Sequence, residues 1–357
     1  MTDTPTLLQQ YEPQAAEVIV ADPQVLEARF SASGRLLAGA GYDGRIRIWD
    51  VSGDKAVESP AITGHHGWVH SVVFHPTEHL LFSADSWGQI RATRIGAEAE
   101  ALWQQTDAHD GWIRQLDISP DGQLLASCAM DGRVALWSTA DGRRLGEFRE
   151  HGCDVQSVRF HPSGQWLASG DGLGKVRIWN VAERRLQTEM DASSLYLLHR
   201  LQDVGGVRLI RFHPDGTRMG CGGVTPKNGA TVQGEPTLLV FDFPAGKMVQ
   251  RLSFGEAKDC FLHDVTWQAD GVLMAVTSGT PGTGKVVFRR LEDDKPFYET
   301  TKLPNCHSLS FSYAGRRLAV VTTNRNSNGN GRRLNADGQY PGNNSPIHLF
   351  HVGSRTA

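Results

Sequence analysis

The stretch GHHGWVHSVVFHP (residues 64–76) returns as AHDGWIRQLDISP (108–120) and again as EHGCDVQSVRFHP (150–162). The copies start 108 − 64 = 44 and 150 − 108 = 42 residues apart. Related phrases such as LLASCAMDGRVALW (124–137) and WLASGDGLGKVRIW (166–179) follow after a polar turn. A fixed period of this size indicates a repeated supersecondary unit, which buries its apolar face only by stacking on its neighbours.

Seven units can be aligned on the residue that opens the polar turn. These anchors are Ala32, Pro76, Pro120, Pro162, Pro214, Ala269 and Tyr313. One apolar run precedes each anchor, a second follows the turn, and the third ends at Trp49, Arg94, Trp137, Trp179, Phe241, Phe288 or Phe350. A fourth, more variable run such as RLGEF or RLQTE completes most units. Apolar alternation broken by Gly, Asp, Asn and Ser predicts antiparallel strands. Four such strands repeated seven times predict an all-β fold, in which residues 1–357 form one seven-bladed β-propeller of four-stranded antiparallel blades.

Composition narrows the class of protein. With 39 glycines and 16 prolines in 357 residues, the chain suits many short strands and turns, and stacked repeats can exceed the size limit of a single core. A net charge of −3 argues against a surface that coats nucleic acid. No secretory signal or membrane-spanning apolar run is visible. The five cysteines are odd in number and widely spaced, which favours inert thiols in a cytoplasmic protein over a disulfide framework.

The repeated residues resemble those of the WD-repeat β-propellers, in a seven-repeat, bacterial-type form. A blade of that family combines a histidine before the first strand, a serine in the second, an aspartate in the following turn and a tryptophan in the third. The matching residues are His65, His109 and His151; Ser127 and Ser169; Asp43 and Asp131; and Trp49, Trp137 and Trp179. The resemblance implies that these side chains hydrogen-bond within a blade and fix its register. All four types coincide only in the third unit, and the fourth has Leu173 where the aspartate is expected.

The last unit lacks a fourth run, so we expect residues 1–24 to provide the missing outer strand and close the ring. Two segments fit, TLLQQY (6–11) and EVIVA (17–21). The first aligns better with the outer run RRLGEF and is our prediction. The second is richer in β-branched residues and remains the alternative.

Two local motifs are better explained by the repeats than by chemistry. GTPGTGKV (279–286) matches the phosphate-loop pattern GxxxxGK, but the strand-like KVVFRRL follows instead of a helix, so we interpret it as a hairpin. HHGWVH (65–70) with His75 could suggest a metal site, but His65 is a repeat position and no acidic or thiol partner is nearby. We therefore expect no metal and no cofactor, and no short motif places Ser, His and Asp in catalytic roles.

One set of equivalent positions could form a binding site at the propeller axis. Six residues before each anchor stand Leu26, His70, Arg114, Gln156, Arg208, His263 and His307. In a propeller these positions surround the mouth of the central channel, and five of the seven side chains can be cationic. They either bind a partner or ligand, or serve as hydrogen-bonded blade residues; the sequence leaves both open.

Three insertions break the period. They are residues 190–206 after the fourth run of unit four, 224–236 between the second and third runs of unit five, and 324–345 at that place in unit seven. Both kinds of connection emerge on one face of a four-stranded blade, and insertions in repeat proteins gather on the binding face. From these segments we select Tyr196, Arg325, Arg332, Arg333 and Tyr340 as partner contacts.

The whole pattern predicts a non-enzymatic scaffold that binds a protein or peptide on the loop-bearing face. The alternative is a small-ligand binder or an enzyme that uses the cationic ring at the channel mouth. We expect a monomeric propeller within a larger assembly, with no membrane and no nucleic acid among its partners. The sequence does not identify the partner.

Overall fold

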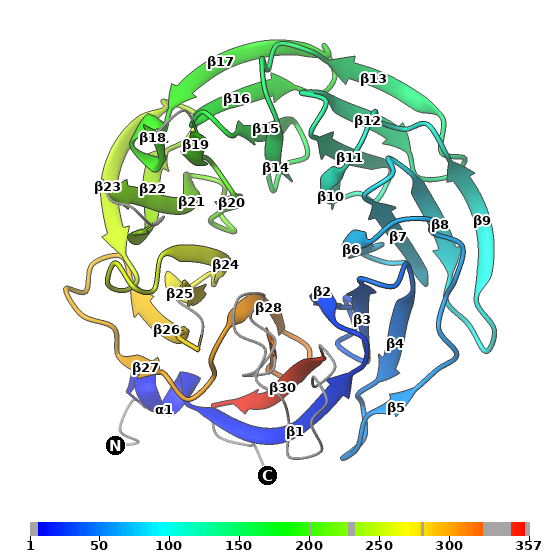
Figure 1. Cartoon of the computed structure of the whole chain (residues 1–357), viewed down its shortest axis with the longest axis horizontal. Helices are drawn as coiled ribbons and strands as arrows, with labels where there is room; N and C mark the ends of the chain where they lie inside the picture. Colours follow the sequence, from blue (N-terminus) through cyan, green and yellow to red (C-terminus); the bar gives the residue numbers. More distant parts are fainter. Residues whose placement is uncertain (1–5, 200–201, 228–232, 280–281, 324–343, 354–357) are drawn as a thin grey trace.

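The computed structural model describes residues 6–199, 202–227, 233–279, 282–323 and 344–353. Within them, seven four-stranded antiparallel sheets surround a central channel (Figure 1), which confirms the predicted fold. The innermost strand of each sheet borders the open centre, and the outermost strands form the rim. None of the helices in these ranges is long and apolar enough to cross a membrane.

The strands of each blade follow the chain from the channel outward. Blades 1 and 2 contain β2 (Val25–Phe30), β3 (Leu36–Gly41), β4 (Ile46–Asp50) and β5 (Val57–Glu58), then β6 (Val69–Phe74), β7 (Leu80–Asp85), β8 (Ile90–Arg94) and β9 (Glu100–Gln105). Blades 3 and 4 contain β10 (Ile113–Ile118), β11 (Leu124–Ala129), β12 (Val134–Ser138) and β13 (Arg144–Phe148), then β14 (Val155–Phe160), β15 (Trp166–Asp171), β16 (Lys175–Asn180) and β17 (Arg185–Asp191). Blades 5 and 6 contain β20 (Leu209–Phe212), β21 (Arg218–Lys227), β22 (Gln233–Asp242) and β23 (Lys247–Ser253), then β24 (Phe261–Trp267), β25 (Val272–Ser278), β26 (Lys285–Arg290) and β27 (Tyr298–Thr300). Blade 7 contains β28 (Cys306–Ser312), β29 (Arg317–Thr322), β30 (Ser345–Val352) and, from the other end of the chain, β1 (Pro13–Ala21).

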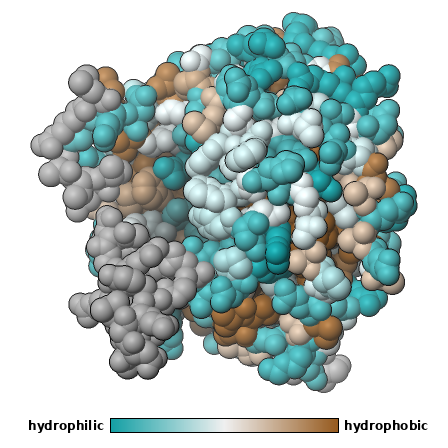
Figure 2. All heavy atoms as spheres, turned by 45° about the vertical axis from the view of Figure 1, so that its right-hand side comes forward, coloured by the Kyte–Doolittle hydropathy of each residue, from teal (hydrophilic) through white to brown (hydrophobic). Residues whose placement is uncertain are grey.

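The apolar core lies between the blades. Each sheet packs against a neighbour on both faces, so all six residues of β7 are buried and its sequence alternates little. Leu80 of blade 2, for example, shares a cluster with Leu125 and Trp137 of blade 3. The tight turns after the second strands need a positive φ, which Gly88 (83°) and Gly132 (75°) adopt without a Cβ clash. The surface in Figure 2 is accordingly mostly hydrophilic, with small and separate hydrophobic patches.

Side chains from one innermost strand bind the backbone of the next blade's innermost strand. The bonds run from Val72 N to Glu27 Oε1 (2.6 Å), Leu116 N to Ser71 Oγ (3.1 Å), Val158 N to Gln115 Oε1 (3.0 Å), Phe160 N to Asp117 Oδ2 (2.6 Å), Leu309 N to Asp264 Oδ2 (3.2 Å), Ala28 N to Ser308 Oγ (3.3 Å) and Phe30 N to Ser310 Oγ (3.1 Å). At the remaining two junctions a side chain donates: Ser157 Oγ to Val207 O (2.8 Å) and Arg211 Nε to Val265 O (2.7 Å). Every junction of the ring is therefore bridged at the channel wall.

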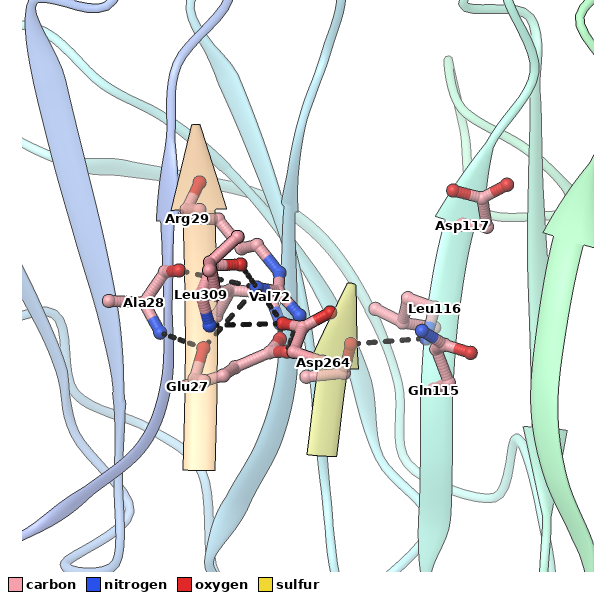
Figure 3. A network of polar contacts seen from close by, with 12 residues as sticks. Glu27, Ala28, Arg29, Val72, Gln115, Leu116, Asp117, Asp264 and Leu309 are labelled. Atoms are coloured by element: carbon pink, nitrogen blue, oxygen red, sulfur yellow. Dashed lines mark hydrogen bonds and ion pairs between the residues drawn. The ribbon is translucent and has the colours of Figure 1, made fainter. Parts of the chain in front are cut away.

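Asp264 connects three blades at this wall (Figure 3). Its carboxylate binds Arg29 of blade 1 at 2.8 Å, Arg211 of blade 5, and the backbone N of Leu309 in blade 7. Burial by itself would raise the pKa of Asp264, but the two arginine charges outweigh it and hold the pKa at about 2. Glu27 Oε2 also forms an ion pair with Arg29 Nη2 at 2.9 Å, so the buried charges compensate one another.

The ring closes through an N-terminal strand, but the predicted segment is wrong. Residues Leu7–Tyr11 form the short helix α1, begun by a Thr6 capping box, and the alternative EVIVA lies within β1. β1 pairs antiparallel with β30, with Val18 opposite His348. The apolar alternation decides between the two segments: Ile19 packs into the cluster between blades 7 and 1, whereas TLLQQY has no period-two pattern.

Two of the three insertions form hairpins where loops were expected. Residues 190–206 contain the 3-10 turn η1 (Ser193–Leu195) and the strands β18 (Tyr196–His199) and β19 (Gln202–Gly205). The 224–236 segment extends β21 and β22 as a long hairpin, and β19 contacts β21. Most of 324–345 lies outside the described residues.

A substitution at the closing strand tests its role. Ile19→Asp should lower the free energy of unfolding by about 2 kcal/mol, because it places a charge in an apolar cluster. Val18→Asp is the matched control, because Val18 is 52% exposed on the same strand and should change stability by less than about 0.5 kcal/mol. Urea unfolding of both variants measures the difference; equal stabilities would contradict closure through the Ile19 face.

The carboxylate at the channel wall gives a second test. Asp264→Asn should destabilise the protein by roughly 3 kcal/mol or more, since it leaves Arg29 and Arg211 buried without their shared counter-charge. Asp50→Asn is the control, because Asp50 pairs with the exposed Arg35 and such pairs contribute at most about 1 kcal/mol. A loss of stability for Asp264→Asn no larger than that of the control would show that the network does not join the blades.

Candidate functional site

One face of the ring carries both the hairpins between second and third strands and the segments that lead into the innermost strands. Backbone hydrogen bonds join the two at equivalent places: Ser86 N donates to Trp68 O (2.9 Å), and Met130 N donates to Trp112 O (3.0 Å). We call this surface the mouth face. The sequence predicted that the insertions and the ring of equivalent residues lie on this face.

The predicted ring is assembled at the channel mouth. A cavity of about 310 Å³ is lined by all seven positions: Leu26, His70, Arg114, Gln156, Arg208, His263 and His307. Glu27, Arg29, Arg211 and Asp264 line the same cavity at deeper positions of the innermost strands. The repeat spacing thus brought together residues far apart in sequence, while their binding role stays a prediction.

The ring is less cationic than expected. Burial, helped by the charge of Arg114, lowers the pKa of His70 to about 4. Burial and the charge of Arg208 lower the pKa of His263 to about 3, and burial also lowers the pKa of His307. The three imidazoles are therefore neutral at pH 7, and of the five side chains that can be cationic only Arg114 and Arg208 carry a charge there. The channel removes water from these rings, and the charges of Asp154 near His70 and Asp264 near His263 do not outweigh that loss, so the neutral form is favoured.

The two arginines of the ring have different partners. Arg114 Nη2 lies 2.9 Å from Asp154 Oδ2, and its guanidinium lies 5.2 Å from the centroid of the Trp112 ring. Arg208 lies over the Phe261 ring at 4.2 Å, and its guanidinium makes no hydrogen bond or ion pair with any described residue.

Three aromatic residues run from blade 1 to blade 3 across the mouth face. Tyr42 and Trp68 pack edge to face with ring centroids 5.3 Å apart, and Trp68 and Trp112 do the same at 5.5 Å. His70 of the ring packs on Trp112 at 5.3 Å, so this aromatic arc reaches the channel mouth. Trp68 is 44% exposed although it is large and apolar. Tyr42, Trp68 and Trp112 are not among the predicted site residues, although the recurrence of Trp68 and Trp112 at one repeat position was an available signal.

In blades 3 and 4 the polar residues shared with the family motif bond as the resemblance implied, whereas Asp43 of blade 1 accepts from Arg47 at 2.9 Å. In blade 3, His109 Nδ1 lies 3.1 Å from Asp131 and His109 Nε2 lies 2.7 Å from Ser127 Oγ. Trp137 Nε1 donates to the same Ser127 oxygen at 2.8 Å. In blade 4, His151, Ser169 and Trp179 repeat these contacts.

The fourth blade obtains its carboxylate from a different position. Leu173 does occupy the turn position, but Asp171 at the end of β15 places Oδ2 2.8 Å from His151 Nδ1. Blade 2 does the same, with Asp85 2.9 Å from His65. A carboxylate on the last strand residue reaches the same histidine as one in the turn, so fixed-position matching misses it.

The comparison with known families agrees with this geometry. The family described as WD domain, G-beta repeat matches residues 21–50, 58–92, 102–138 and 142–180, which form the first four blades. Residues 21–180 of this chain therefore carry four WD repeats within a seven-bladed β-propeller. Blades 5 to 7 complete the same ring with four strands each, although the matched residues do not extend to them.

Similar proteins share only part of their length with this propeller. Protein hir-1 of Neurospora crassa is 27% identical over 165 residues, which cover 39% of this chain and 16% of hir-1. Nuclear distribution protein nudF of Aspergillus niger is 28% identical over 149 residues, covering 36% and 33%. Human Coronin-7 is 35% identical over 112 residues, covering 30% and 12%. The chain thus spans a third or less of these relatives, all from eukaryotes, and the bacterial type remains a prediction.

Two of the insertions form hairpins at blades 4 and 5. The hairpin β18–β19 packs against the extended β21, and Tyr196 donates its hydroxyl hydrogen to Asp203 Oδ1 at 2.7 Å. Tyr196 is partly exposed and stays a predicted contact. The other selected loop residues lie outside the described part of the chain: Arg325, Arg332, Arg333 and Tyr340.

The other motifs have structural partners. Lys285 of the GxxxxGK pattern lies 3.4 Å from Asp259 and 3.0 Å from Glu299, and it starts the strand β26, so its ammonium already has two counter-charges. His75, beside the HHGWVH run, accepts from Glu78 N at 2.9 Å and faces Gly122 O at 3.1 Å. Among the residues that the structure describes, no group of three or more His, Cys, Asp or Glu side chains could hold a metal ion.

The neutral histidines predict an acid-sensitive stability. An unfolded histidine takes up its proton near pH 6.5, whereas His70 and His263 do so only near 4 and 3 in the folded propeller. Between these values the unfolded chain binds more protons, so the free energy of unfolding should fall as the pH drops from about 6.5 to about 4. Urea unfolding at pH 7, 6 and 5 measures this slope. His70→Gln with His263→Gln should flatten it, whereas the exposed control His79→Gln should not; an unchanged slope in the double variant would contradict the assignment.

Proposed function

We propose that this WD-repeat propeller is a non-enzymatic scaffold that binds a protein or peptide segment across the mouth face. The observation that carries the proposal is the aromatic arc of Tyr42, Trp68 and Trp112. Large aromatic side chains that remain exposed on a rigid surface are frequent anchors of protein interfaces.

Tyr42 and Trp68 of the arc lie outside the buried core, and Trp112 is half-buried. The structural tryptophans Trp49, Trp137 and Trp179 are at most 2% exposed, whereas Trp68 is 44% and Trp87 is 69% exposed. Exposed apolar side chains also mark the neighbouring hairpins of this face: Met130, Leu173 and Leu198. Because removing apolar surface from water lowers the free energy, burying this area against a partner would be favourable.

The surface has a shape suited to an extended segment. The aromatic arc lies on blades 1 to 3, and the β18–β19 and β21–β22 hairpins stand at blades 4 and 5, with the channel mouth between them. A partner strand lying across the mouth would contact both. We include Tyr196, Arg325, Arg332, Arg333 and Tyr340 as contacts in this proposal, because they belong to the insertions of the same face.

An enzyme at the channel mouth is the weaker candidate. Ser278 Oγ lies 2.8 Å from His263 Nε2, a distance compatible with a nucleophile and its base. Yet the pKa of His263 is lowered to about 3, so this imidazole holds a proton too weakly to act as a general base. Within the described residues no carboxylate hydrogen-bonds to its other ring nitrogen, as an orienting third residue would.

The cysteines and the similar proteins bear on the cellular compartment and the assembly in which the propeller acts. No disulfide joins the five cysteines, all of which lie in the described residues, and four of them are buried, as suits a reducing compartment. We propose that the propeller acts in the cytoplasm as a monomer within a larger assembly. The similar region in a protein named for nuclear distribution supports an interaction module without identifying its partner.

A random 12-residue peptide library displayed on phage and selected on the full chain tests the scaffold function. Selected peptides should lose at least about tenfold in affinity on Trp68→Ala, because truncating a central aromatic anchor typically has that effect. Tyr313→Ala is the control: Tyr313 is 61% exposed, but it lies in a turn on the opposite face. Isothermal titration calorimetry measures the affinities, and thermal melting verifies that both variants fold. Peptides that bind both Trp68→Ala and Trp112→Ala as tightly as the original protein would contradict the proposal.

A further inference from the structure

The charges around the mouth cavity balance except at one residue. Arg29 and Arg211 share Asp264, and Arg29 also pairs with Glu27 at 2.9 Å. Arg114 pairs with Asp154 at 2.9 Å. Arg208 alone among the arginines that line the cavity has no carboxylate partner within the described residues. The mouth therefore carries one uncompensated positive charge.

The fold gains little from a charge at Arg208. Its backbone N donates to Gly222 O at 2.9 Å, which any residue except proline could do, and its guanidinium lies over the Phe261 ring. Contact with an aromatic ring does not use the N–H donors in the guanidinium plane, so these donors remain available at the cavity. Desolvation by the channel disfavours the charged form, so retaining an arginine here has a cost that an anionic ligand would offset.

A second polar group of the same cavity lacks a partner. Gln156 Oε1 is buried and accepts no hydrogen bond within the described part of the protein. An orphaned acceptor next to an orphaned cation calls for a ligand that brings one negative group and one donor. A peptide segment has both, in an acidic side chain and a backbone N–H.

We propose that the mouth cavity binds the carboxylate of an aspartate or glutamate side chain in an extended segment of a protein partner, with Arg208 as the anchor. This inference rests on the proposed scaffold function and specifies the chemistry of the partner. The N–H groups of the segment face Gln156, and a neighbouring apolar side chain packs on the aromatic arc.

Charge and size both favour a carboxylate. The single free guanidinium matches one monoanion and can bind it through two parallel N–H···O bonds. A phosphate dianion would meet only one free cation, with Asp154 close to the neighbouring arginine and the three histidines neutral. A cavity of about 310 Å³ lies at the small end of ligand sites, enough for a side chain and not for a folded domain.

The same phage-displayed peptides provide the test. Selected peptides should share one Asp or Glu beside an aromatic or large apolar residue. Replacing that acid by its amide in the peptide, or Arg208→Gln in the protein, should each weaken binding at least about tenfold. The two changes together should weaken it no more than either alone, because they remove the same contact. Arg208→Lys should restore part of the affinity, and the loss should shrink at high salt.

Arg185→Gln is the matched control, because Arg185 lies on the outer strand β17 with its side chain 62% exposed and paired to Glu183. It should leave the affinity unchanged. If Arg208→Gln does not fold, the amide peptide measured on the original protein still decides the question. Peptides that depend on Trp68 but carry no acid, or that ignore Arg208→Gln, would overturn the carboxylate site and leave the scaffold function standing. Failure to select any peptide, or binding indifferent to Trp68 and Trp112, would remove the scaffold function and this inference with it.

Discussion

The innermost strand of each blade has one hydrogen-bonding edge that faces the channel and no further strand. Unpaired backbone N–H groups at such an edge are costly when water is scarce. In this propeller the acceptors come from the adjacent blade: Glu27 accepts a hydrogen bond from Val72 N, and Gln115 accepts one from Val158 N. The inner edges of the blades therefore depend on their neighbours, although the outer strands pair within their blades.

This constraint explains why the channel is polar. The side chains that accept backbone hydrogen bonds across the junctions are Ser, Gln, Asp and Glu, and the buried acids among them require cations. Arg29 and Arg211 serve Asp264, and Arg159 pairs with Asp117 at 2.7 Å. The scaffold thus uses nearly all the charge near the axis for its own cohesion. The charge that is left over, on Arg208, is the one that can serve a partner.

The two halves of the mouth face differ in how they are built. Blades 2 to 4 hold their hairpins with histidine–aspartate contacts, as between His151 and Asp171, which fixes the surface on which the aromatic arc lies. At blade 5 the face is extended by added hairpin length, where β21 and β22 run beyond the ordinary blade. Blades 1 to 3 carry the aromatic arc, and the long β21–β22 hairpin of blade 5 extends the opposite part of the face. The channel mouth lies between the two, where the ring residues meet.

The sequence by itself determined the repeat, the number of blades and the seven residues around the mouth, because a fixed period converts equivalent positions into equivalent places on a ring. Tertiary structure decided the charge and the partners of those residues. His70 and His263 look cationic in the sequence, yet burial makes them neutral; Arg114 and Arg208 look alike, yet only Arg114 meets a carboxylate. Packing against Ile347 and its neighbours likewise decided the closing strand, and the tertiary structure leaves Trp68 44% exposed. Periodicity is a property of the chain, whereas protonation, pairing and exposure depend on which residues of other blades lie nearby.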